Sequence, residues 1–316
     1  MNALGLIMLL IFLIVISGMG YFFYQNLPGE PVNLVEDKSS IVLQEKVSYS
    51  TSSQFYKNMR FQDKRISYFV ETFCGSKKKE QFQNALRILE EETILEFYEI
   101  NSEPEITVTC SDLKPDSENK GYFIAGEGGP SKIINTSLYA VIFEGKISLF
   151  RDEKCPTPNI ALHEILHVLG FDHNDNPNSI LFPTLDCKQK LDNYLIEDIN
   201  NLYTVTGKPD LKISEVEAIK SGAYLNFEIK VVNQGIKSAS EVELAIYTDE
   251  DLVIHANGKK FFDLGEVAVG STKILTVDNL KIGRGTKEVS FVVDSNNGVD
   301  ELFEDNNKKT LVLYGD

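Results

Sequence analysis

The hydrophobic positions change their spacing along the chain, and the first pattern is one unbroken apolar run. Ala3 to Phe23 contains no charged residue over 21 positions. As a helix this run would span about 31 Å, which matches the hydrocarbon thickness of a bilayer. The following stretch mixes polar and apolar residues with prolines, a glycine and a serine/threonine cluster. We therefore expect a transmembrane helix over residues 1–24 and a stalk or linker over 25–60.

Residues 61–207 alternate between strand-like and helix-like patterns. Two segments have the composition of strands, and two others carry apolar residues at helical spacing. The strand segments are 66–72 and 105–110, and the helical segments are 77–98 and 191–203. Two apolar runs within 138–150 are separated by Glu144 and Gly145, which predicts a hairpin. These patterns indicate an α+β domain.

From residue 208 the apolar positions recur with a period of two. Short alternating runs are separated by turn sequences such as Asn257-Gly258 and Asn297-Gly298. Seven or so short strands in about 105 residues are typical of an all-β sandwich of immunoglobulin-like type. Gly207, Lys208 and Pro209 mark the boundary, so we expect this second domain to occupy residues 208–316.

Composition and charge narrow the possible partners. The chain is 42% hydrophobic and 25% charged, as expected for a folded protein, and its formal net charge is −16. A strongly negative chain is repelled by nucleic acid and by an anionic membrane surface, so neither is an expected partner. The charge suits an exposed, soluble domain.

The apolar N-terminal run has two interpretations. A cleavable secretory signal is one, but the run is long for that and no clear A-x-A-like site follows it. No lysine or arginine precedes the run, so charge gives little information about its direction. Almost all of the chain follows Phe23, and its even number of cysteines suggests an oxidising compartment. We favour an uncleaved signal anchor, which makes this a single-pass protein of the cell membrane with both domains extracellular.

The candidate chemistry lies in the segment HEILHVLGFDH, which begins at His163 and holds three of the four histidines of the chain. His163 and His167 lie one helical turn apart and can present two imidazoles to one ion, with Glu164 beside them. Gly170 tolerates the left-handed conformation that ends a helix, so the chain can return and bring His173 to the same ion. Three protein ligands and one open position are the arrangement of a catalytic zinc.

The pattern HExxHxxGxxH resembles the signature of the metzincin metallopeptidases at all five positions. The segment from Ser179 to Pro183 is similar to the methionine-bearing turn of the matrixin branch, with Leu181 at the methionine position. The order ISYFVE, ALRILEEETILEFYEI, ITVTC also looks like a matrixin. This resemblance implies a mixed, mostly parallel twisted sheet with helices, and one catalytic Zn²⁺ held by His163, His167 and His173.

The resemblance also implies a substrate and two disulfides. Metzincins bind an extended peptide along an edge strand, and here that rim is expected between Gly126 and Phe143. Of the three possible connectivities we prefer Cys74 with Cys110 and Cys155 with Cys187, since the first pair would lie at one end of neighbouring parallel strands and the second would flank the metal helix. Four free thiols are the alternative in a reducing compartment.

The second domain resembles another family. Its runs PDLKISEVE, VVNQG and VDSNNGVDELFEDNN look like the CARDB modules of prokaryotic surface proteins. The acidic loop 294–306 misses the EF-hand spacing at its glycine, so we favour a polar hairpin over a calcium site. The sandwich could bind a partner at the cell surface, but no chemistry in it identifies one.

The expected function is that of an extracellular, membrane-anchored zinc endopeptidase, with Glu164 as the general base that activates a zinc-bound water. The protein and peptide substrates would be bound in extended conformation. One alternative is a cell-surface adhesion or binding protein whose metallopeptidase-like domain is inactive. Another is a metallohydrolase that acts on a different bond, such as a cell-wall amide.

Overall fold

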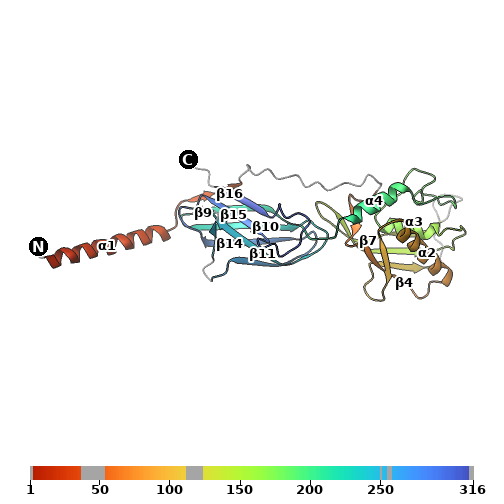
Figure 1. The fold of residues 1–316 in the computed structure, drawn as a ribbon, viewed down its shortest axis with the longest axis horizontal. Coiled ribbons are helices and arrows are strands. Elements are labelled where there is room, and N and C mark those ends of the chain that lie inside the picture. Colours follow the sequence, from red (N-terminus) through yellow and green to blue (C-terminus); the bar gives the residue numbers. More distant parts are fainter. Residues whose placement is uncertain (1–2, 37–53, 112–123, 250, 255–257, 313–316) are drawn as a thin grey trace. The chain divides into compact units, whose positions relative to one another are not determined.

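The computed structural model describes residues 3–36, 54–111, 124–249, 251–254 and 258–312 (Figure 1). The chain divides into two compact units. The sandwich unit contains residues 1–45, 209–233 and 238–316, and the α+β unit contains residues 46–208 and 234–237.

A helix occupies the predicted anchor, α1 (Ala3–Asn26). Its segment Gly5–Asn26 is long and apolar enough to cross a membrane, and none of this segment is buried. A secretory signal near an N-terminus can also form an apolar helix of this kind, so α1 is consistent with both interpretations of the sequence.

The α+β unit is built on one six-stranded sheet. Its strands are β3 (Met59–Phe61), β4 (Arg65–Val70), β5 (Glu96–Glu99), β6 (Ile106–Cys110), β7 (Gly126–Asn135) and β8 (Ala140–Leu149). The order is β3-β8-β6-β4-β5, with β7 paired to β8. All pairings are parallel except that of β7, which is antiparallel. This confirms the mixed, mostly parallel sheet that the sequence and its resemblance predicted.

Three helices complete the unit: α2 (Ser76–Glu92), α3 (Asn159–Val168) and α4 (Asn193–Thr204). The apolar residues predicted for α2, among them Phe82, Leu86 and Leu89, are buried in one core with α3, α4 and the sheet. The Arg60 side chain lies in this core, donates to the carbonyl oxygens of Leu202 and Val205, and stacks on the Tyr203 ring. A buried cation is tolerated there because these groups replace its water.

Two predicted elements differ from the structure. The helix expected over 77–98 ends at Glu92, and its last residues form β5 instead. The hairpin expected within 138–150 is the single strand β8, whose antiparallel partner is β7. Gly145 does not turn the chain. A Cβ at this position would lie 2.3 Å from the Val168 side chain, so the glycine permits close packing against α3.

The sandwich unit consists of two sheets. One has the order β1-β9-β10-β14, and the other has β12-β11-β15-β16-β2 with β13 on β11. The strands are β1 (Pro31–Asn33), β2 (Val35–Glu36), β9 (Leu211–Ser221), β10 (Tyr224–Asn233), β11 (Ala239–Thr248), β12 (Asp251–Leu252), β13 (Phe261–Val267), β14 (Thr272–Lys281), β15 (Glu288–Val293) and β16 (Lys308–Val312). The predicted all-β sandwich is therefore confirmed.

Two strands of the sandwich come from the stretch expected to be a linker. β1 pairs with β9 and β2 pairs with β16, so this short segment contributes to both sheets. Leu34 lies between β1 and β2 and is buried in the sandwich core. Strands of three and two residues are too short to show a period in the sequence. The α+β unit is thus inserted between β2 and β9 of the sandwich.

Both predicted disulfides are present. Cys74 is bonded to Cys110, and Cys155 is bonded to Cys187, each with a Cα–Cα distance of 5.1 Å. The first joins the end of β6 to the chain after β4. The second joins the segment before α3 to the loop before α4. The chain segments that precede and follow α3 are therefore linked covalently.

Candidate metal centre

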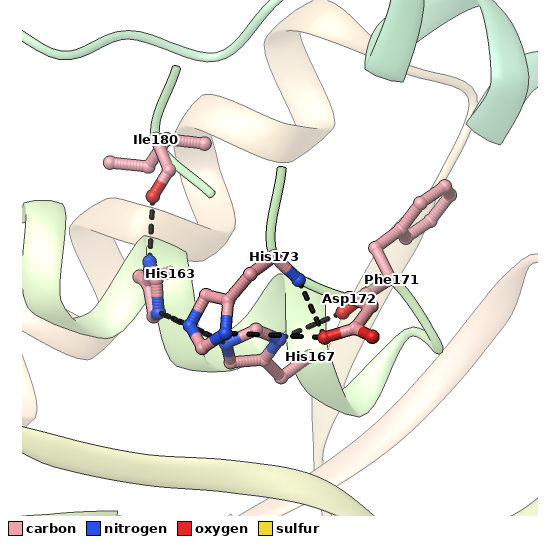
Figure 2. Close-up of polar contacts among 6 residues, drawn as sticks. All are labelled: His163, His167, Phe171, Asp172, His173 and Ile180. Atoms are coloured by element: carbon pink, nitrogen blue, oxygen red, sulfur yellow. Dashed lines mark hydrogen bonds and ion pairs between the residues drawn. The ribbon is translucent and has the colours of Figure 1, made fainter. Parts of the chain in front are cut away.

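The helix α3 carries two of the three histidines and then ends at a glycine. Gly170 has a φ of +97°, in the left-handed region, and a Cβ there would lie 2.7 Å from Met59 Cγ. A side chain at this position would therefore be disfavoured by both backbone conformation and packing. Beyond the turn the chain comes back alongside α3 and brings His173 to the histidines of the helix (Figure 2).

The three imidazoles converge on one point. The Nε2 atoms of His163 and His167 are 2.9 Å apart, and His173 Nε2 is 3.2 Å from that of His167 and 3.3 Å from that of His163 (Figure 2). A tetrahedral zinc with Zn–N bonds of about 2.0–2.1 Å separates its ligand atoms by roughly 3.3 Å. The nitrogens therefore fit one such ion with small adjustments.

Hydrogen bonds fix which nitrogens face this point. His163 Nδ1 lies 2.6 Å from the carbonyl oxygen of Ile180, and His167 Nδ1 lies 2.7 Å from that of Phe171 (Figure 2). A carbonyl oxygen only accepts, so each Nδ1 carries the hydrogen and each Nε2 presents a lone pair. Backbone carbonyls commonly orient metal-binding histidines in this way.

The charge state of the histidines agrees with this assignment. Burial lowers the pKa of His163 to about 3, with the neighbouring His167 adding to the effect, and burial also lowers the pKa of His167. Both rings are neutral near pH 7. Two lone pairs 2.9 Å apart repel each other unless a cation or a proton lies between them. The donor set therefore suits a divalent metal.

Two further residues adjoin the histidines. Asp172 accepts a hydrogen bond from the backbone N–H of His173 at 2.7 Å and lies 4.0 Å from its Nδ1. The Phe55 ring lies 5.9 Å from that of His167, and the Phe55 N–H donates to the Gly170 carbonyl oxygen. Sequence reasoning missed Phe55 because it belongs to the segment expected to be a linker and has no motif around it.

Glu164 is buried on α3 against the glycine-rich start of β7. A Cβ at Gly126 would lie 2.8 Å from Glu164 Cγ and Oε1, and one at Gly128 would lie 2.4 Å from the Glu164 carbonyl oxygen. Burial raises the pKa of Glu164 to about 8, and the charge of Glu127 adds to the shift. The expected substrate rim, 126–143, therefore begins beside the expected general base.

The turn expected to resemble the matrixin methionine turn is tightly held. Leu181 is 1% exposed, and its carbonyl oxygen accepts from the Asn174 N–H. Ser179 Oγ accepts from the Leu181 N–H and donates to Asp192. This network holds the turn that contains Ile180, whose carbonyl oxygen contacts His163 Nδ1, and the Leu181 side chain packs in the core of the unit.

Among the described residues, one other group of side chains could hold a metal ion. Oxygens of Asp294, Glu301 and Glu304 lie within 4.8 Å of one another. Asp294 accepts from the N–H groups of Gly298 and Val299, and Glu301 accepts from the Leu211 N–H and from Asn307 Nδ2. These carboxylates lie in the loop between the antiparallel strands β15 and β16.

Comparison with known proteins agrees with the two units. Residues 60–204 match the family model for Matrixin, and residues 208–311 match the family model for CARDB. None of the curated proteins matches the chain.

Two solved structures are similar to parts of this chain. A CARDB domain from Pyrococcus furiosus, crystallised in complex with di-metal ions, is 22% identical and covers 34% of this chain and 96% of its own, with a TM-score of 0.28. High choriolytic enzyme 1, a hatching-enzyme zinc-protease from the medaka fish Oryzias latipes, is 16% identical and covers 45% of this chain and 90% of its own, also with a TM-score of 0.28. The family matches show that the chain contains a matrixin-like domain over residues 60–204 and, after it, a CARDB β-sandwich domain over residues 208–311.

Proposed function

We propose that this protein is a membrane-anchored, extracellular, zinc-dependent endopeptidase. The observation that carries the proposal is the convergence of three Nε2 atoms within 3.3 Å of one another, two of them on neutral rings oriented by backbone carbonyls. His163, His167 and His173 would hold one zinc ion. When bound, zinc acidifies a water molecule and polarises a carbonyl group.

Glu164 is the general base in this proposal. Its carboxylate takes the proton from the attacking water and then delivers it to the nitrogen of the leaving amine. A base works best when its pKa lies close to the working pH, and burial raises the pKa of Glu164 to about 8. Glu164 belongs to the same helix as two of the ligands, so its position relative to the metal is fixed by α3.

Strand β7 supports an extended peptide as the substrate. Among the described strands it pairs only with β8, so its other edge is open, and Gly126 and Gly128 place its backbone against Glu164. An extended peptide can add to such an edge through main-chain hydrogen bonds. This arrangement favours cleavage within a peptide chain over hydrolysis of a bond in a bulky, branched substrate.

Two features support the extracellular location. The helix α1 could serve as the membrane anchor. The two disulfides of the α+β unit are expected to persist in an oxidising environment and to be reduced in the cytosol.

The test uses the purified full chain in detergent, with zinc measured by elemental analysis and cleavage measured on a mixed peptide library. We expect one zinc per chain in the wild type and in Glu164→Gln, because Glu164 is not a ligand. The variant should lose about 10²- to 10⁴-fold in kcat/KM, the usual contribution of a general base. Near wild-type activity in Glu164→Gln would disprove its role. Bound zinc without cleavage by the wild type would favour the adhesion alternative, in which the sandwich is the working part.

A further inference from the structure

The edge strand beside Glu164 is almost free of side chains. Its first five residues are Gly126, Glu127, Gly128, Gly129 and Pro130. Only Glu127 among them carries a charge. A peptide bound along this part of β7 would therefore meet backbone atoms and a single ionisable side chain.

The direction of the Glu127 side chain follows from its neighbours. Cβ atoms at Gly126 and Gly128 would both meet Glu164, so these positions face α3. Successive residues of a strand face opposite sides of the sheet, which places the Glu127 side chain on the side away from α3.

The register of the sheet agrees with this direction. Glu127 is paired with Ser148 of β8, and Ser148 is paired with Thr109 of β6. The hydroxyl oxygens of Ser148 and Thr109 are 3.0 Å apart, and the preceding residue of β8, Ile147, is buried in the core. Glu127, Ser148 and Thr109 thus form one polar row across the sheet, and the row ends at the open edge of β7.

The Glu127 carboxylate is exposed and forms no ion pair with any described residue. The nearest lysine by register is Lys146, which is paired with Gly129 and so lies diagonally across from Glu127. The lysine of β7, Lys132, is paired with Glu144 at 3.5 Å. The charge of Glu127 is therefore available to a bound peptide.

We propose that Glu127 is a specificity-determining residue, which selects extended peptides with lysine or arginine at the position across the β7 edge from it. The substrate side chain at that position would continue the row of Glu127, Ser148 and Thr109. Opposite charges on directly paired residues of neighbouring strands attract each other, and like charges repel. This inference rests on the proposed peptidase function, and it adds the chemical class of the substrate.

The experiment compares the full-length wild type with Glu127→Gln and Glu127→Lys on a peptide library in which each position carries lysine, glutamine or glutamate. In the wild type, kcat/KM should be about three- to fivefold higher for lysine than for glutamine at one position. Glu127→Gln should remove this preference, and Glu127→Lys should reverse it towards glutamate. Preferences at the other positions should be unchanged.

Glu91→Gln is the matched control, since Glu91 is an exposed residue of α2 and the substitution alters the net charge equally. It should keep the wild-type preference, which separates a local contact from the overall charge of the protein. An undiminished lysine preference in Glu127→Gln would overturn this inference while leaving the peptidase intact. Absence of any cleavage by the wild type would overturn the proposed function and this inference with it.

Discussion

At the candidate metal centre, hydrogen bonds to backbone carbonyls determine which ring nitrogen of His163 and of His167 carries the hydrogen. Carbonyl oxygens of Ile180 and Phe171 hold the hydrogens of His163 and His167 on Nδ1, and this leaves the two Nε2 lone pairs for a metal. The spacing of the histidines and the glycine could be found in the sequence, because an α-helix places residues four apart on one face. The carbonyl partners could not, since they depend on how the chain folds directly after Gly170 and on where the 179–182 turn packs.

The residue Glu301 makes the stability of the sandwich depend on pH. Burial raises the pKa of Glu301 to about 7, and the charges of Glu304 and Asp210 add to the shift. The folded state therefore keeps the Glu301 proton between about pH 4.5 and 7, where the unfolded chain has lost it. The free energy of unfolding should fall as the pH rises through this range and level off above pH 7.

In the wild type we expect the free energy of unfolding to fall by about 1 to 2 kcal/mol between pH 5 and pH 8, and Glu301→Gln should remove most of this fall. The new amide oxygen can still accept from the Leu211 N–H. Asn307 Oδ1 is buried and has no hydrogen-bond partner. If the side-chain amide of Asn307 rotates by about 180°, this oxygen can accept a hydrogen bond from the new side-chain amide at position 301. Urea unfolding of the sandwich at the two pH values measures the effect, and the exposed Glu217→Gln serves as control. An equal fall in Glu301→Gln and wild type would contradict the role of Glu301.

At the scale of elements, the approach of β7 to α3 determines the geometry of the candidate site. In a sequence, a run of glycines such as the one at 126–129 usually signals a turn. In the structure the same glycines belong to a strand, and they are needed because the Glu164 side chain and carbonyl occupy the space that a Cβ would fill. A packing requirement between distant segments leaves no periodic signal in a sequence, which also explains why Gly145 was expected in a turn.

Two glycine substitutions should separate positioning from folding. A Cβ in Gly126→Ala meets the mobile end of the Glu164 side chain, so the carboxylate can move away at little cost in stability. We expect kcat to fall about 10- to 100-fold, as for a misplaced catalytic group, with zinc content and Tm close to wild type. In Gly128→Ala the Cβ meets the backbone of α3, and both Tm and kcat should fall.

The measurement combines steady-state kinetics, elemental analysis and thermal unfolding. Gly75→Ala is the control, since no atom lies within 4 Å of a Cβ at that position. If Gly126→Ala retained the wild-type kcat, Glu164 would not depend on the glycine for its position.

At the scale of the whole molecule, the chain runs from α1 into the sandwich before it forms the α+β unit. The sequence placed the domains in a simple order, anchor, linker, peptidase, sandwich, because the composition of residues 25–60 is that of a linker. The strands β1 and β2 pair with strands more than 170 residues later in the chain, and each adds an edge strand to one sheet of the sandwich. Such pairing depends on the complete fold, and five residues of strand carry too little pattern to predict it.

If this N-terminal segment belongs to the sandwich, its one core residue should stabilise the sandwich and leave the α+β unit unaffected. Leu34 is 9% exposed and packs in the sandwich core, whereas Val32 in the same segment is 45% exposed. Leu34→Ala should lower the free energy of unfolding of the sandwich by about 2 kcal/mol, at the low end for a buried leucine because the site lies near the surface. Val32→Ala should change it by less than about 0.5 kcal/mol. Urea unfolding of the full chain measures the effect of each substitution on the sandwich, and zinc content reports on the α+β unit. Equal effects of Leu34→Ala and Val32→Ala would show that β1 and β2 act as a linker.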